Sequence, residues 1–277
     1  MGGGLVATDD GRPVVLVPGV YSGNLVRLLP TPSAAVATVA GRHLVYKYSG
    51  FDNQWNSDPF ARPDAAIAPD KRALLPGEAA TFANVSSFTS GINCVMVDLR
   101  GLPFDAIPTA DDFLLRSGTS PDASDFATLS GRASVSVRRG AGTGGSDRVM
   151  LYWSSSDPHA RNAWLQVTVK ATDNTRLASP DVFYFGSLVG ETGNGGGATG
   201  WRVNAEDLGA VKRALNTDAT ITNRFDFNRD GRITASDLGA IKANLNRSLP
   251  ALVAPPVPSV AATETPARRR VAEGVLT

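Results

Sequence analysis

The chain has 277 residues, with 27 Lys and Arg, 26 Asp and Glu, and a formal net charge of +1. A nucleic-acid binder needs a dense basic face, so this balance argues against nucleic acid as a partner. The single cysteine, Cys94, excludes an internal disulfide, and two histidines leave little scope for a histidine-built metal site. With 28 glycines and 18 prolines, the composition favours a folded, turn-rich protein with much β-structure.

Residues 1–42 are interpreted as an N-terminal extension or linker, because clusters of Gly, Pro and Ala surround only short apolar runs. They lack the basic and apolar segments of a secretory signal peptide. No run of about 18 apolar residues predicts a membrane span. One interpretation is that the chain is a fragment of a longer product.

Residues 43–185 are predicted to form a β-sandwich of roughly seven to ten strands. Apolar and polar residues alternate repeatedly in this region, as they do in strands with one buried face. Turns rich in Gly and Pro separate the alternating segments. These segments are 43–48, 80–84, 91–99, 134–138, 147–153, 164–170 and 181–186.

No catalytic residue is predicted in this region, and we expect a protein without enzymatic activity. A glycosidase needs two carboxylates across a sugar-binding cleft, and nothing in the sequence pairs Asp98, Asp111 or Asp112 with a second acid. No Gly-x-Ser-x-Gly nucleophile motif follows the apolar residues 14–17.

An aromatic cluster leaves an alternative function open. Aromatic rings on a protein surface can stack on sugar rings, although core packing is the default for aromatics on strands. The alternative is a carbohydrate-active protein that binds or hydrolyses polysaccharide. The cluster consists of Tyr46, Tyr48, Phe51 and Trp55.

Residues 186–249 contain an internal repeat of thirty positions, in which the segment 201–216 recurs as 231–246. Such a repeat indicates a duplicated supersecondary unit. Apolar residues at helical spacing follow in each copy and predict two helices that bury these stripes against each other. The stripes are Leu208, Val211 and Leu215 in the first copy and Leu238, Ile241 and Leu245 in the second.

The twelve residues 226–237 have oxygen-bearing groups at the spacing of an EF-hand calcium loop. Gly231 stands at position 6, where the chain must turn sharply. The alternative interpretation is an Asn- and Asp-rich turn that opens a helix. The predicted ligands at positions 1, 3, 5, 7, 9 and 12 are Asp226, Asn228, Asp230, the carbonyl of Arg232, Thr234 acting through water, and Asp237.

The corresponding first loop departs from this pattern. Counting back eleven positions from Asp207 reaches Gly196, and residues 196, 198 and 200 supply no carboxylate. If residues 195–200 are an insertion, the ligands become Glu191, Asn194, Asn204 and Asp207. Both a weaker calcium site and a loop without metal remain open. Val203 and Ile233, at position 8 of each loop, are expected to pair across the two loops.

The paired loop–helix units resemble a bacterial type I dockerin module. The resemblance covers residues 186–249 and implies a small all-α domain folded by duplicated calcium loops. It further implies binding to a cohesin-type domain or cell-surface scaffold outside the cell. In that family, partner contacts come from the two residues before loop position 12 and from a pair early in the helix. Here these are Ala205, Glu206, Lys212, Arg213, Ala235, Ser236, Lys242 and Ala243.

The sequence therefore predicts a mainly β chain with a β-sandwich, a dockerin-like calcium domain and a disordered Pro-rich tail at 250–277. The expected function is calcium-dependent docking of the sandwich to an extracellular partner.

Overall fold

The computed structural model describes residues 36–52, 63–129, 131, 133–153, 160–194 and 196–256. It also describes the backbone of β1 (Val6–Ala7) and β2 (Pro13–Val14), which pair antiparallel. Most of the predicted N-terminal extension, Trp55 and the tail from residue 257 onward lie outside the described residues.

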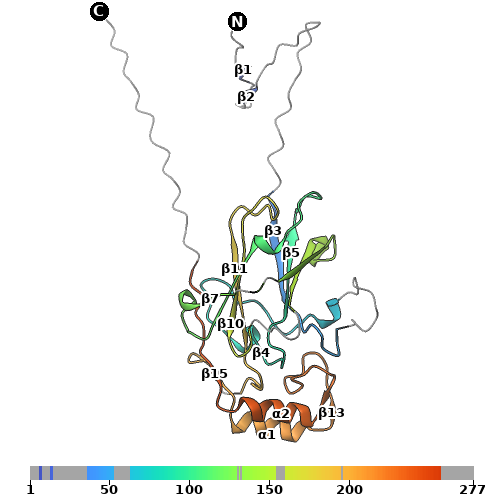
Figure 1. The fold of residues 1–277 in the computed structure, drawn as a ribbon, viewed down its shortest axis with the longest axis vertical. Coiled ribbons are helices and arrows are strands. Elements are labelled where there is room, and N and C mark those ends of the chain that lie inside the picture. Colours follow the sequence, from blue (N-terminus) through green and yellow to red (C-terminus); the bar gives the residue numbers. More distant parts are fainter. Residues whose placement is uncertain are drawn as a thin grey trace, which may run out of the picture.

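Two β-sheets face each other across an apolar core, which confirms the predicted β-sandwich (Figure 1). In both sheets neighbouring strands run antiparallel, apart from the β4–β11 pair. In spatial order, the five-stranded sheet contains β4 (Val85–Ser86), β11 (Asp181–Ser187), β10 (Trp164–Val169), β6 (Phe113–Gly118) and β7 (Ala127–Thr128). The four-stranded sheet contains β3 (Thr38–Leu44), β5 (Cys94–Arg100), β9 (Asp147–Tyr152) and β8 (Ser134–Arg138).

Alternation along the strands explains how the main core forms. On β5, the side chains of Val95, Val97 and Leu99 enter the core between the sheets. On β10 and β11, alternate residues such as Val167 and Phe183 meet them from the other sheet. Burial of these apolar side chains on the inner faces is what holds the two sheets together.

Some predicted strands were wrong or incomplete. The first strand of the sandwich, β3, runs from Thr38 to Leu44, so the sandwich starts before residue 43. Residues 47–50 form a turn in which Tyr48 has a φ of 63°. The predicted strand 80–84 is instead occupied by the 3-10 helix η2 (Phe82–Asn84), with an Asn84 hydrogen bond that closes the turn. The other short 3-10 helices are η1 (Pro63–Ala66), η3 (Ala110–Asp112), η4 (Ala123–Asp125) and η5 (Thr143–Gly145).

The C-terminal unit contains the two predicted helices, α1 (Ala205–Ala214) and α2 (Ala235–Asn244), which lie side by side across one end of the sandwich (Figure 1). Two short antiparallel ladders join the two loop–helix units of the repeat crosswise. One pairs β12 (Trp201–Arg202) with β15 (Ser248–Leu249), and the other pairs β13 (Thr217–Asp218) with β14 (Arg232–Ile233). The residues before each helix therefore adjoin the residues after the other helix, and the two helices run antiparallel.

This crosswise pairing corrects one expectation. Val203 and Ile233 are both buried, but their backbones do not pair with each other. Ile233 pairs with Thr217, and Val203 exchanges hydrogen bonds with Arg247 and Asn246. Each loop is thus closed by the chain that leaves the opposite helix.

A second core joins the C-terminal unit to the outer face of the five-stranded sheet. Trp164 and Tyr184 on that sheet belong to the same apolar cluster as Val211 and Ile241 on the helices. Strands β10 and β11 are consequently buried on both faces, and both read as largely apolar sequences.

The disordered tail was predicted to begin at residue 250, but ordered packing continues beyond that residue. Leu252 and Ala254 are fully buried, and the segment 251–254 exchanges backbone hydrogen bonds with residues 77–80 of the sandwich. In addition, the Trp164 indole donates a hydrogen bond to the carbonyl of Pro250 at 2.9 Å. Packing against the sandwich therefore continues past residue 250.

Candidate metal loops and partner surface

The second loop is closed by the carboxylate of Asp237. Its Oδ1 accepts the backbone N–H of Phe227 at 2.7 Å, and its Oδ2 accepts the N–H of Thr234 at 2.9 Å. The second bond is part of the N-terminal cap of α2, whereas the first spans ten residues and ties the start of the loop to the start of the helix. A simple capping turn does not require that longer connection.

At the other end of this loop, Asp226 supports the sharp turn. One of its oxygens accepts the N–H of Gly231 at 2.9 Å, and the other accepts the N–H of Asp230 at 3.2 Å. Gly231 has a φ of 90°, a conformation that favours glycine. Both Asp226 and Asp237 are fully buried, and burial raises the pKa of Asp226.

The remaining predicted ligands line the rim of the loop. Asp230 is exposed, and its carboxylate accepts hydrogen bonds from the Asn228 amide and from the N–H of Arg232. The hydroxyl of Thr234 accepts the N–H of Ser236 as the cap of α2.

The first loop repeats these bonds from an unexpected starting residue. Asp207 Oδ1 accepts the N–H of Thr192 at 3.0 Å, and Asp207 Oδ2 accepts the N–H of Asn204 at 2.9 Å. Thr192 therefore corresponds to Phe227, which makes Glu191 the equivalent of Asp226. Sixteen positions separate Glu191 from Asp207, against eleven between the two aspartates of the second loop, so the first loop is five residues longer.

The structure thus supports the alignment that contains an insertion. It does not bring together all of the residues proposed for that alternative, because the Asn204 side chain caps α1 through Glu206 and Asn194 forms no hydrogen bond with a described residue. The sequence analysis missed Thr192, whose hydroxyl also donates to Asp207 at 2.6 Å. Its position directly after an acidic residue was the available signal.

Glu191 contributes a buried carboxylate to the first loop. Its side chain is fully buried, Oε1 accepts the N–H of Gly193 at 2.8 Å, and Oε2 has no hydrogen-bond partner among the described residues. Burial, together with repulsion from Asp207, raises the pKa of Glu191 to about 7.

The residues of both loops fit a hard divalent cation. Among the described residues, no three His, Cys, Asp or Glu side chains converge on one point, because the loop carboxylates are turned onto backbone N–H groups. Yet each loop buries two carboxylates, and none of them forms an ion pair with a Lys or Arg in the described part of the chain. The buried guanidinium of Arg229 offsets the charge of Asp226 only in part, because the pKa of Asp226 is still raised. Buried carboxylates without a cation are costly, and an all-oxygen donor set suits calcium.

The residues predicted to contact a partner remain exposed despite the packing against the sandwich. They lie on the sides of α1 and α2 that the second core leaves uncovered. The eight exposed residues are Ala205, Glu206, Lys212, Arg213, Ala235, Ser236, Lys242 and Ala243.

Residues 201–246 match the family model of the dockerin type I domain. The C-terminal unit thus carries a type I dockerin domain at these residues. The matched segment covers both helices of the dockerin and its second loop, but it begins after Glu191. No curated protein and no solved structure gives a significant match to the chain.

The dockerin packs its second loop directly onto the sandwich. The carbonyl of Arg229, at loop position 4, accepts the N–H of Gly50 at 2.7 Å, and the carbonyl of Phe227 accepts the N–H of Thr89 at 2.8 Å. The Arg229 side chain is 1% exposed, and its guanidinium lies 4.6 Å from the centre of the Tyr46 ring. The sequence analysis missed Arg229, because a loop arginine is ordinarily solvated.

The aromatic cluster is divided by this arrangement. Tyr46 is buried between Phe88 and Arg229, so it cannot stack on a sugar. Tyr48 is 46% exposed, and Trp55 lies outside the described residues. The structure therefore does not assemble the predicted platform.

The acidic residues considered for catalysis have structural partners. Asp98 is fully buried and accepts two hydrogen bonds from Arg148, at 2.7 and 2.8 Å, and others from Thr143. His43 Nε2 lies 2.9 Å from the same carboxylate. Burial opposes ionisation, but these partners outweigh it and hold the pKa of Asp98 well below its usual range. Asp112 is likewise bonded to Thr172 and Asn174.

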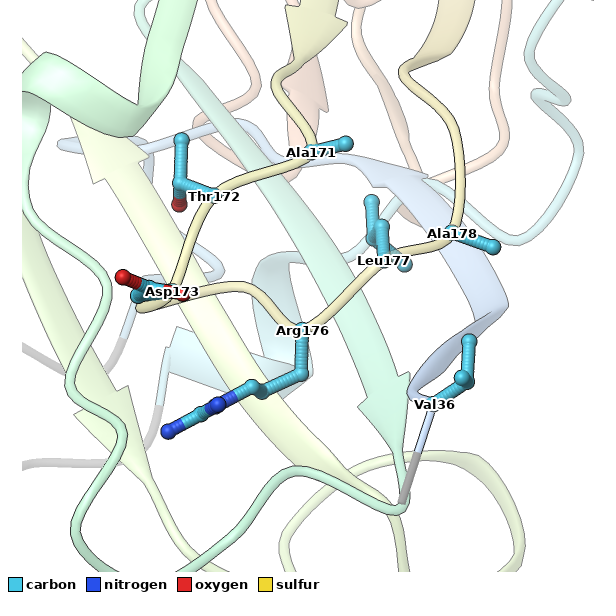
Figure 2. A pocket seen from close by; sticks show the side chains of 7 residues that line it. All are labelled: Val36, Ala171, Thr172, Asp173, Arg176, Leu177 and Ala178. Atoms are coloured by element: carbon cyan, nitrogen blue, oxygen red, sulfur yellow. The ribbon is translucent and has the colours of Figure 1, made fainter. Parts of the chain in front are cut away.

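A surface hollow of about 560 Å³ lies beside the loop between β10 and β11. In Figure 2 the side chain of Arg176 extends from this loop in the direction away from Val36. The hollow is lined by one acidic residue and no aromatic ring, so it lacks a surface for sugar stacking.

Neither α-helix has the length and apolarity to cross a membrane, and the described residues offer no other candidate for a membrane-spanning helix.

Proposed function

We propose that this chain binds calcium through both dockerin loops and docks its β-sandwich to a cohesin-type partner at an extracellular or cell-surface assembly. Domains of the type I dockerin family bind cohesin domains, and residues 201–246 match that family. The observation that carries the proposal is the repeated hydrogen-bond pattern of the two loops, in which Asp207 and Asp237 occupy equivalent positions.

In the second loop, the cation would be held by the side chains of Asp226, Asn228, Asp230 and Asp237, with Thr234 through water and the carbonyl of Arg232. In the first loop, Glu191 and Asp207 supply the charged oxygens, and Asn194 and Asn204 remain the neutral candidates. Calcium would offset the repulsion between buried carboxylates and fix each loop against the start of its helix.

Ordering of both loops aligns α1 and α2 and so presents the exposed partner surface. Because the helices run antiparallel, Ala205 and Glu206 belong to the same end of the helix pair as Lys242, and Ala235 and Ser236 to the same end as Lys212 and Arg213. The second of these ends carries two positive charges and no negative one among the partner residues, which favours an acidic patch on the partner.

A binding titration tests this proposal. The full chain is titrated against a panel of type I cohesin domains, with calcium and again after removal of calcium by a chelator. Saturable binding to at least one cohesin that is lost without calcium is the expected result. Failure to bind any cohesin in calcium would contradict the docking function.

A further inference from the structure

We infer that calcium binding by the second dockerin loop is thermodynamically coupled to the opening and closing of the β-sandwich. The inference rests on the proposed calcium binding and goes beyond it, because it makes the loop a structural part of the sandwich. A dockerin attached only through a linker would bind calcium without affecting its neighbour.

Backbone contacts form the first link between loop and sandwich. Loop positions 2 and 4, Phe227 and Arg229, direct their carbonyls to Thr89 and Gly50 of the sandwich. The predicted ligands at positions 1, 3 and 5 alternate with them. A Cβ atom at residue 50 would lie 3.1 Å from the carbonyl oxygen of Arg229, so the absence of a side chain there permits this close approach.

The second link is the buried side chain of Arg229. Its guanidinium donates hydrogen bonds to the carbonyls of Asn223 and Asp226, and it lies over the ring of Tyr46. Tyr46 belongs to the main core and contacts Phe88, with 5.2 Å between ring centres. One side chain thus connects the backbone of a predicted calcium ligand with the core between the sheets.

The consequence follows from linkage. A cation that binds only the ordered loop stabilises every contact that requires this loop conformation. The stabilisation free energy grows with the logarithm of one plus the ratio of free ligand to Kd, so the open population falls by about that ratio. Here those contacts include Arg229 with Tyr46 and the two backbone bonds. Opening of the sandwich must break them, so calcium is expected to suppress that opening.

Cys94 provides a reporter for opening of the sandwich. It is the only cysteine of the chain, it lies on the central strand β5, and it is fully buried. Its side chain belongs to a separate apolar cluster with Val45 and Ala66 on the outer face of the four-stranded sheet, and the Ala66 carbonyl accepts the N–H of Tyr46 at 2.9 Å. A thiol reagent can reach Cys94 only when this cover beside Tyr46 opens, so the labelling rate measures the population of that open state. The adjacent Val45 donates its N–H to the Cys94 carbonyl at 3.2 Å, next to Tyr46.

The experiment measures Cys94 labelling by a thiol-reactive disulfide in the full chain, with and without calcium, while calorimetry records calcium binding independently. We expect labelling to slow by about 100-fold when free calcium is 100 times the Kd of the second loop. In Arg229→Lys, which keeps the charge but loses the planar guanidinium, the slowing is expected to shrink. In the control Arg247→Lys, an exposed residue outside both loops, it is expected to persist.

Three outcomes would contradict the inference or the role it gives to Arg229, and they are distinguishable. Calcium binding with an unchanged rate of Cys94 labelling would contradict the coupling alone. Absence of calcium binding would contradict the proposed function and the coupling with it. An equal slowing in wild type and Arg229→Lys would show that Arg229 is not the link.

Discussion

The guanidinium of Arg229 lies 4.6 Å from the centre of the Tyr46 ring, and it joins the second dockerin loop to the core of the β-sandwich. The two residues are 183 positions apart in the chain. Together with the Trp164–Pro250 bond, this contact makes the dockerin and sandwich a single packed body. A partner bound to the helices would therefore hold the sandwich in a fixed orientation.

Replacing Arg229 with Met is expected to lower the free energy of unfolding by about 2–4 kcal/mol, because buried carbonyls lose charged donors and the Tyr46 ring loses its cation. Chemical denaturation of the full chain measures this change. The matched control is Arg232→Met in the same loop, which is mostly exposed and is expected to change stability by less than about 0.5 kcal/mol. Equal effects of the two substitutions would contradict the proposed role of Arg229.

A methyl group at residue 50 is expected to separate the loop from the sandwich. The added Cβ in Gly50→Ala meets backbone atoms of Arg229 and Asp230 at 3.1 Å, which predicts a loss of about 1–3 kcal/mol. Gly239→Ala is the control, since its Cβ meets nothing within 4 Å and Ala favours a helix. Thermal unfolding of both variants tests this, and an unchanged Tm for Gly50→Ala would argue against a close interface.

The stability of calcium-free protein is expected to depend on pH through Glu191. Its pKa is raised from the usual value of 4.5 to about 7, so its stabilising contribution is present below pH 4.5 and is lost as the pH rises through 7. Relative to Glu191→Gln, the wild type should therefore lose Tm between about pH 4.5 and 7. The comparison of the two proteins removes the contributions of other carboxylates.

Addition of calcium is expected to reverse this trend, because the cation favours the ionised carboxylate. A difference in Tm between wild type and Glu191→Gln that stays constant across this pH range would show that Glu191 does not have the raised pKa.

Partner binding is expected to be more sensitive to charge at one end of the helix pair. Reversal of Lys212 and Arg213 to Glu should weaken cohesin binding by about tenfold or more and reduce its salt dependence, because both side chains are exposed and form no ion pair with a described residue. Lys242→Glu should have a smaller effect, since Glu206 already lies at that end. Affinities measured at two salt concentrations decide this, and equal losses at both ends would contradict the expectation.

The repeat, the helical spacing of apolar residues and the strand alternation predicted elements whose formation depends on nearby residues. The thirty-residue repeat predicted both helices, and Val211 and Ile241 are buried as their spacing requires. Leu245, also assigned to the apolar stripe, is 38% exposed because α2 ends one residue earlier. The alternation of residues 134–138 and 164–170 likewise corresponds to β8 and β10.

Features that depend on distant contacts could not be predicted in the same way. Five extra residues hide the equivalence of Glu191 and Asp226, which only the hydrogen bonds to Asp207 and Asp237 reveal. The burial of Arg229 depends on a tyrosine far away in the chain. Leu252 stands in a Pro-rich segment that looks disordered, yet its carbonyl accepts the N–H of Ala80.

The number of calcium ions bound per chain tests the account most directly. Calorimetric titration of the calcium-stripped full chain is predicted to give two sites, with one site lost in Asp226→Ala and the other lost in Glu191→Gln. Circular dichroism of the variants provides the control for folding. A wild-type chain that binds no calcium, or one whose stoichiometry is unchanged by both substitutions, would contradict the assignment of the two loops.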